Sequence, residues 1–162
     1  MAALLALDLA TTFGWCVGAH DAPPRYGSVR LVGRERAPRY AALLEWLDDA
    51  RRVHGFAELV AEAPMVSGDF AGRDAALLAL GLAAHVELWC WDAGIRQRPS
   101  VVVGTARKAV LGRGSFARGT AKAVVMDWAR REGMEPGDDN AADACLLWHY
   151  ATGYRRQREM AA

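Results

Sequence analysis

The chain has 162 residues, enough for one domain with a sizeable core and too few for two substantial ones. Hydrophobic residues make up 52% and charged residues 24%, with a net charge of +1, which is ordinary globular composition. No apolar run is long and clean enough for a signal peptide or a bilayer span. We therefore expect residues 1–162 to form a single domain, with about 154–162 as a frayed tail.

Apolar runs and the alternation of apolar with polar residues predict that the first part of the chain forms strands. Residues 2–9, 13–18 and 26–32 are expected to be three antiparallel strands in a meander. From 39 to 53 apolar residues recur at helical spacing, which predicts a helix that lies on the sheet. Residues 56–61 read as a fourth strand.

The segment from about 74 to 92 predicts a long helix that is apolar nearly all round. Such a helix needs cover on more than one side. The sheet would supply one side, and we expect the other, around Leu77 to Trp89, to be a dimer interface.

The remaining elements complete an α/β pattern. Residues 99–103 are expected to be the fifth strand, and Thr105 to cap a short helix. Two further helices follow, over 120–132 and 140–152. The order predicts a five-stranded mixed sheet with helices on both faces.

Three cysteines, Cys16, Cys90 and Cys145, lie at wide spacings inside apolar segments. They form no Cys-x-x-Cys pair of the kind used for zinc or redox chemistry. We expect them to be buried and reduced, which indicates a cytoplasmic setting.

Basic residues concentrate in one part of the chain. Between Arg96 and Arg131 there are nine of them against a single acid, Asp127. Part of this segment is glycine-rich, so it predicts either a phosphate-binding surface or a solvated basic face, with equal weight.

Four carboxylates follow a spacing that would let them converge. Asp8 ends the first strand and Glu62 the fourth, while Asp139 and Asp143 are four residues apart on the last helix and so point the same way. Buried carboxylates repel one another unless cations neutralise them, and hard oxygen ligands favour magnesium or manganese. Ordinary roles are also open: Glu62 as an ion-pair partner, for example, or Asp138 and Asp139 as helix caps.

These motifs together resemble the RuvC family of Holliday-junction resolvases, in the RNase H-like nuclease superfamily. The resemblance rests on ALLALDLA around Asp8, LVAEAP around Glu62 and the late DDNAADACLLWHY, and it spans nearly the whole chain in element order. It implies an RNase H-like α/β fold and a magnesium-dependent endonuclease that nicks four-way DNA junctions symmetrically as a homodimer.

The resemblance also implies roles for individual residues. Asp8, Glu62 and Asp143 match three of the family's metal-binding acids, which would hold two Mg²⁺ ions, with Mn²⁺ as a possible substitute. For the fourth ligand we favour Asp139. Asn140 stands where the family usually has Asp or His and is a possible weaker ligand, which leaves Asp138 as a cap or a supporting residue.

The resemblance further implies DNA contacts. Lys122, one of only two lysines, matches a family lysine that approaches the scissile phosphate, and a surface lysine is the equal alternative. Flanking phosphates and the branch point would be contacted by six further residues: Arg107, Lys108, Arg113, Arg118, Met65 and Phe70.

Three other functions stay open. An RNase H-like nuclease acting on RNA or flapped DNA would use the same metals. A non-catalytic branched-DNA-binding protein would keep only the basic face. An actin-like ATPase with a phosphate turn after Asp8 is disfavoured because no second phosphate hairpin is visible.

Overall fold

The computed structural model describes residues 2–65 and 73–153. Its ten helices and strands follow the predicted order, and their bounds are β1 Ala3–Asp8, β2 Thr12–Gly18, β3 Arg25–Arg30, α1 Arg36–His54, β4 Phe56–Ala61, α2 Arg73–Ala93, β5 Arg96–Gln97, α3 Val103–Leu111, α4 Ala121–Arg131 and α5 Asp139–Thr152. The predicted tail, 154–162, lies outside the described residues.

The five strands form one mixed sheet in the order β3-β2-β1-β4-β5. The β1–β2 and β2–β3 pairs are antiparallel, whereas β4 is parallel to both β1 and β5. The predicted meander and the α/β fold class are confirmed.

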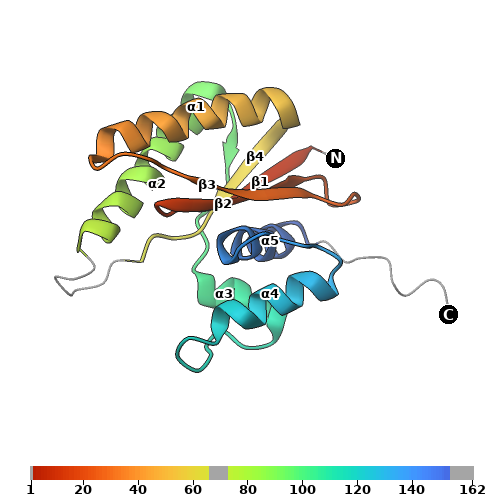
Figure 1. Ribbon diagram of the computed structural model, residues 1–162. Coiled ribbons are helices and arrows are strands. Elements are labelled where there is room, and N and C mark those ends of the chain that lie inside the picture. Colours follow the sequence, from red (N-terminus) through yellow and green to blue (C-terminus); the bar gives the residue numbers. More distant parts are fainter. Residues whose placement is uncertain (1, 66–72, 154–162) are drawn as a thin grey trace.

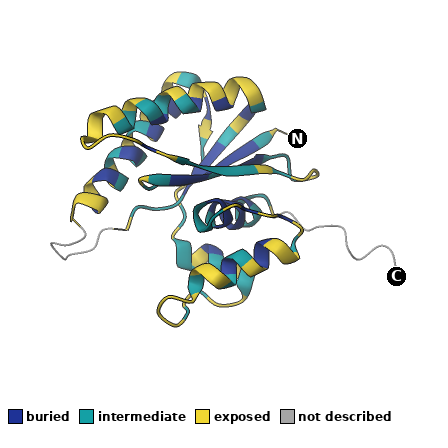
Figure 2. Ribbon diagram, in the orientation of Figure 1, coloured by how far each residue is buried: buried dark blue, intermediate teal, exposed yellow. Residues whose placement is uncertain are grey.

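Helices cover both faces of the sheet. Figure 1 shows α1 and α2 on one face, with α5 directly against the other and α3 and α4 beyond it. Each face has its own buried apolar cluster, and Figure 2 shows that the buried residues follow these two interfaces. The three cysteines are buried and free, as expected.

Alternation along the central strands determines which face each side chain joins. On β1, Leu5 and Leu7 join the cluster under α1 and α2, whereas Leu4 and Ala6 join the cluster with α5. By the same alternation Asp8, two residues after Ala6, lies on the α5 face.

The fifth strand was predicted in the wrong place. Pairing with β4 as a strand is limited to Arg96 and Gln97, and within 99–103 only Val101 bridges, to Glu62. Pro99 has no amide hydrogen to donate, which interrupts the ladder. The helix that follows begins at Val103, so Thr105 lies inside α3 and does not cap it.

Candidate functional site

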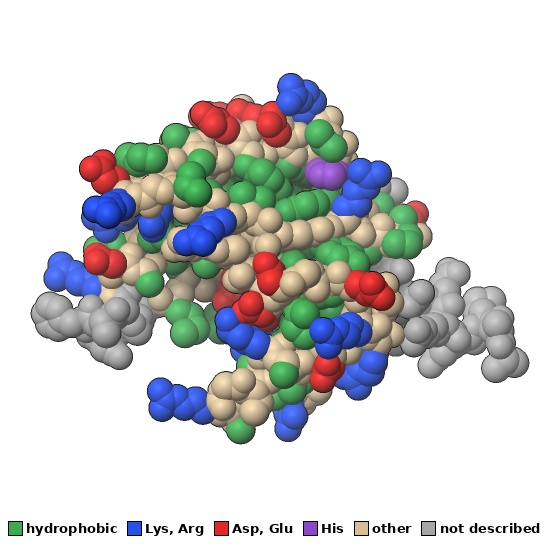
Figure 3. Space-filling model, viewed as in Figure 1, with side chains coloured by type: hydrophobic (Ala, Val, Ile, Leu, Met, Phe, Trp, Pro, Cys, Tyr) green, Lys and Arg blue, Asp and Glu red, His purple; other side chains and the backbone are tan. Residues whose placement is uncertain are grey.

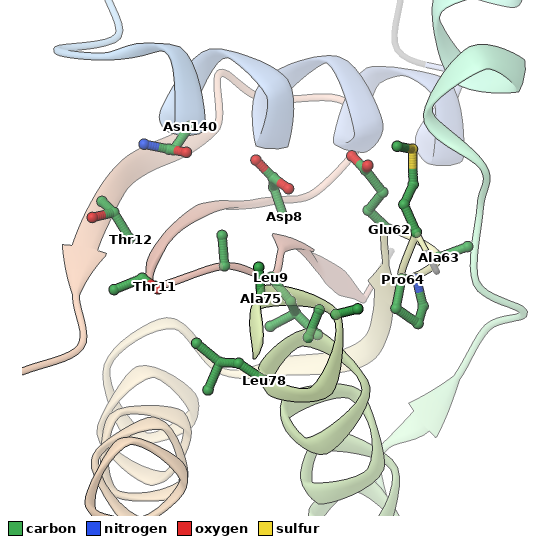
Figure 4. A pocket seen from close by; sticks show the side chains of 14 residues that line it. Asp8, Leu9, Thr11, Thr12, Glu62, Ala63, Pro64, Ala75, Leu78 and Asn140 are labelled. Carbon is green, nitrogen blue, oxygen red and sulfur yellow. The ribbon is translucent and has the colours of Figure 1, made fainter. Parts of the chain in front are cut away.

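The carboxyl ends of β1 and β4 bring two acids side by side. The backbone N–H of Glu62 donates to the carbonyl of Leu7 at 2.9 Å, so Glu62 follows β4 at the level of Asp8 on the neighbouring strand. Val60 of β4 joins the α5-side cluster, and Glu62 is two residues further along. Both carboxylates point toward α5 (Figure 4).

The last helix supplies the third acid. Asp143 lies on α5 with its side chain 13% exposed, and Arg107 Nη2 of α3 donates to its Oδ1 at 3.2 Å. The charge of Asp143 reaches both Asp8 and Glu62. The structure therefore gathers Asp8, Glu62 and Asp143 from positions far apart in the sequence.

Burial and mutual repulsion perturb these acids strongly. Burial, followed by the charges of Asp143 and Asp139, raises the pKa of Asp8 to about 7. Burial, followed by the charges of Asp8 and Asp143, raises the pKa of Glu62 to about 8. Burial also raises the pKa of Asp143, against the opposing effect of Arg107. A cluster with this surplus of negative charge attracts cations.

Asp139 lies at the more exposed side of the cluster. Lys122 of α4 forms an ion pair with it, and this contact lowers the pKa of Asp139. The side chain of Lys122 is 71% exposed, so its Nζ stands between the acids and solvent. The sequence places Lys122 only near the start of a helix, and the fold carries it to the acids.

A pocket of about 520 Å³ opens beside the acids. Asp8, Glu62 and Asn140 line it together with Thr11, in the turn after β1, and Thr12, the first residue of β2 (Figure 4). Its other wall is mostly apolar, from α2 and from the residues after Glu62, among them Met65, whose side chain is 69% exposed. Phe70 lies outside the described residues.

Three features hold α5 in place: the Asp138 cap, which the sequence analysis expected, and the Ser28 contact and the close approach at Gly14, which it missed. The Ser28 hydroxyl of β3 donates to Asp138 Oδ2, while Asp138 Oδ1 caps the helix by accepting from the N–H of Ala141 at 2.9 Å. Gly14 of β2 lies opposite Asp8, and a Cβ there would meet the carbonyl oxygen of Asn140 at 1.8 Å. A glycine inside a strand is the sequence signal for such a close approach.

The acids have the chemistry of a site for hard cations, although the site is not closed. No three His, Cys, Asp or Glu side chains among residues 2–65 and 73–153 stand close enough to hold one metal ion as they lie. Arg107 and Lys122 are paired with Asp143 and Asp139 instead. Partly buried carboxylates that repel one another nevertheless have the oxygen chemistry that Mg²⁺ or Mn²⁺ prefers.

The other predicted DNA contacts are exposed beyond the acids. Lys108 lies on α3, and Arg113 and Arg118 on the segment between α3 and α4. Arg113 stacks over the ring of Phe116 at 4.5 Å. Figure 3 shows Lys and Arg side chains gathered over the α3 and α4 layer.

Comparisons with known proteins identify the fold. The chain matches no protein-family model and no curated protein sequence. The RuvC structure from Thermus thermophilus is similar at 14% identity and a TM-score of 0.67, over 94% of this chain and 97% of that one. T. thermophilus RuvC in complex with Holliday junction substrate gives 16% identity and a TM-score of 0.70, over 94% and 96% of the two chains.

A third solved structure comes from a eukaryote. The yeast mitochondrial Holliday junction resolvase Ydc2 is 9% identical with a TM-score of 0.65, over 93% of this chain and 78% of that one. The chain therefore has the RuvC-like, RNase H-like fold that the sequence predicted.

Proposed function

We propose that this chain, which has the fold of the RuvC-like resolvases, is a magnesium-dependent endonuclease that resolves four-way DNA junctions. The observation that carries the proposal is the convergence of Asp8, Glu62 and Asp143 from β1, β4 and α5 within that fold. One of the structural neighbours is RuvC in complex with Holliday junction substrate.

In this proposal Asp8, Glu62, Asp143 and Asp139 hold two Mg²⁺ ions, and Asn140 is the alternative to Asp139. Bound ions of this kind supply an activated water and charge stabilisation at the leaving oxygen of a phosphodiester. The acids fix the position of the reacting phosphate. Lys122, whose Nζ lies at the edge of the cluster, offsets charge that develops on that phosphate.

The basic surface holds the arms of the junction. Lys108, Arg113 and Arg118 are exposed and free to contact flanking phosphates, which contributes salt-dependent affinity. Met65 is exposed at the rim of the pocket, where it would contact an unstacked base at the branch point. Phe70, predicted to share this role, remains a prediction from the sequence.

A homodimer would place two such sites on one symmetric junction. Five apolar residues of α2 are exposed and recur at helical spacing: Leu77, Leu80, Ala84, Leu88 and Trp91. They form the exposed stripe of α2, nearly opposite the buried stripe that includes Leu78, Leu82, Val86 and Trp89. We propose that the exposed stripe packs against its copy in a second chain.

The apolar composition of α2 has a second interpretation, as a membrane-spanning helix. Among the described helices it alone is long and apolar enough to cross a membrane, a test that the core helix of a soluble protein also passes. Because its buried stripe packs in the core under the sheet, we favour the dimer. Three free cysteines are in keeping with a reducing compartment such as the cytoplasm.

The proposal is tested by cleavage of a synthetic four-way junction with Mg²⁺, beside duplex, flapped DNA and RNA–DNA hybrid substrates. We expect paired symmetric nicks in the junction, and a loss of about a thousandfold or more in the Asp8→Asn variant, because one metal ligand is removed. Cleavage of hybrids or flaps in place of junctions would identify a different RNase H-like nuclease. Junction binding without cleavage in either Mg²⁺ or Mn²⁺ would overturn the enzymatic role.

A further inference from the structure

Arg107, which the sequence analysis predicted to contact a DNA phosphate, lies against the acidic cluster in the structure. It was expected on the DNA-binding surface beside Lys108, but its side chain is only 17% exposed and its guanidinium contacts Asp143. Its neighbour Lys108 is exposed. Helix α3 therefore presents two adjacent cations to different surroundings, one to solvent and one to the acids.

The guanidinium is only partly satisfied in this position. Nη2 donates to Asp143 Oδ1 at 3.2 Å, which is a long contact for a charged pair. Nε is buried and has no hydrogen-bond partner among the described residues. A buried donor without a partner is unfavourable, so hydrogen bonding alone does not account for holding Arg107 here.

Electrostatics does account for it. The positive charge of Arg107 acts on Asp8 at the end of β1, Glu62 just after β4 and Asp143 on α5. Lys122 pairs with Asp139 and is largely exposed, whereas the charge of Arg107 lowers the raised pKa of Glu62. Arg107 is thus the cation that offsets repulsion at the inner, Glu62 side of the cluster.

We propose that Arg107 is an internal counter-cation that competes with a divalent metal ion for Asp143. The inference rests on the metal site of the proposed function and concerns what occupies that site before the metal binds. Asp143 Oδ1 faces the guanidinium, and the described side chains do not form a closed set of metal ligands. Binding of the metal therefore requires Asp143 to exchange Arg107 for the ion.

The test is Mn²⁺ binding by isothermal titration calorimetry in the absence of DNA, with the wild type and the Arg107→Gln variant. Glutamine keeps part of the side-chain length and removes the charge. We expect Arg107→Gln to bind Mn²⁺ more tightly by about tenfold, because the competing cation is gone. The rise in Tm caused by saturating Mn²⁺ should also be larger in the variant than in the wild type.

The matched control is Arg130→Gln. Arg130 Nη1 lies 3.2 Å from Asp127 Oδ1 on α4, the same distance as in the Arg107 pair, but both side chains are exposed and outside the acidic cluster. This variant should leave Mn²⁺ affinity unchanged. An equal gain of affinity in Arg130→Gln would show a nonspecific effect of net charge and would overturn the proposal.

Unchanged or weaker Mn²⁺ binding by Arg107→Gln would show that Arg107 supports Asp143 and does not compete for it, which also overturns the proposal. Should Arg107→Gln fail to fold without metal, Arg107→Lys keeps the charge and should bind Mn²⁺ about as the wild type does. Tight binding by Arg107→Lys would instead exclude charge as the cause. Because no DNA is present, a chain that shows this competition yet cuts no junction would contradict only the proposed function.

Discussion

Asp8 and Glu62 are carboxylates that the fold keeps largely away from water and close to further negative charge. Their raised pKa values follow from burial first and from neighbouring acids second. Proteins retain such groups where a bound cation or a proton transfer needs them. The two residues therefore make the metal-free protein sensitive to pH.

The sign of this dependence follows from the direction of the shifts. The pKa of Asp8 rises from 3.8 to about 7 and that of Glu62 from 4.5 to about 8 on folding. Groups whose pKa is raised contribute stability that is full below the ordinary values and lost as the pH rises through the raised ones. Without metal, the chain should be more stable at about pH 5.5 than at about pH 9.

Replacing Asp8 should reduce the loss of stability that the metal-free protein shows at high pH. We expect Asp8→Asn, in EDTA, to raise the free energy of unfolding by about 2 kcal/mol more at about pH 9 than at about pH 5.5. Urea unfolding at both pH values measures the difference. Asp127→Asn is the control, since Asp127 is exposed on α4. If Asp8→Asn lowered the free energy of unfolding at about pH 9, burial of the ionised Asp8 carboxylate would not be unfavourable and the prediction would be wrong.

At the residue scale the sequence was informative about the acids and uninformative about their cations. Asp8, Glu62 and Asp143 were identified because an acid that ends a buried strand, or lies on an apolar helix face, needs a reason. Arg107 had no such signal, because an arginine beside Lys108 on a short helix looks the same in sequence whether it faces solvent or the interior. Only the packing of α3 against α5 distinguishes the two.

At the scale of elements, the position of α5 sets the geometry of the site. The helix packs against β1 and β2, and its first turn is fixed by Asp138, which joins it to Ser28 of β3. Gly14 permits this approach because it has no side chain. The distance between Asp143 and Asp8 thus depends on Ser28, Asp138 and Gly14, which lie outside the proposed set of metal ligands.

This dependence predicts a coupling between Ser28 and Asp138. Ser28→Ala should lower the free energy of unfolding by about 1–2 kcal/mol, as expected for a partly buried hydrogen bond to a charged group. A double-mutant cycle with Asp138→Asn, measured by urea unfolding, should give a coupling of about 1 kcal/mol. Ser100→Ala is the matched control, because Ser100 is exposed. If the changes in unfolding free energy caused by the two substitutions were additive, the Ser28–Asp138 hydrogen bond would be contradicted.

Most elements were predictable because their apolar periodicity is strong and their ends carry clear signals. The cap at Asp138 was among the expected roles and is confirmed. The fifth strand was misplaced because Val101, Val102 and Val103 have high β-propensity, while Pro99 and the start of α3 prevent an extended ladder. The Ser28 contact joins residues 110 positions apart and leaves no local signature.

At the scale of the whole molecule, α2 has two apolar stripes, and within residues 2–65 and 73–153 only one of them is buried. Leu88 is 59% exposed and Trp91 82% exposed, and both continue the exposed stripe defined above. Large apolar side chains that share a face indicate an interface more often than isolated ones do. In the proposed dimer, the exposed stripe of one chain packs against the same apolar stripe of the other chain.

Introducing charge into the stripe should separate the dimer. We expect Leu88→Asp with Trp91→Ser to weaken self-association by about a hundredfold or more, since both apolar contacts are lost and charges are buried. Sedimentation velocity over a concentration series measures the change. Val53→Asp on α1 is the control, as Val53 is 64% exposed outside the stripe. A wild type that remains monomeric at high concentration would contradict the dimer itself.

The order of the elements along the chain has a consequence for when the acidic cluster forms during synthesis. Asp8 and Glu62 emerge early, but Asp139 and Asp143 belong to α5, the last described helix, which begins at residue 139 of 162. A nascent chain shorter than this carries only half of the acids and lacks the layer that buries them. A chain that ends before α5 should therefore lack the assembled acidic cluster.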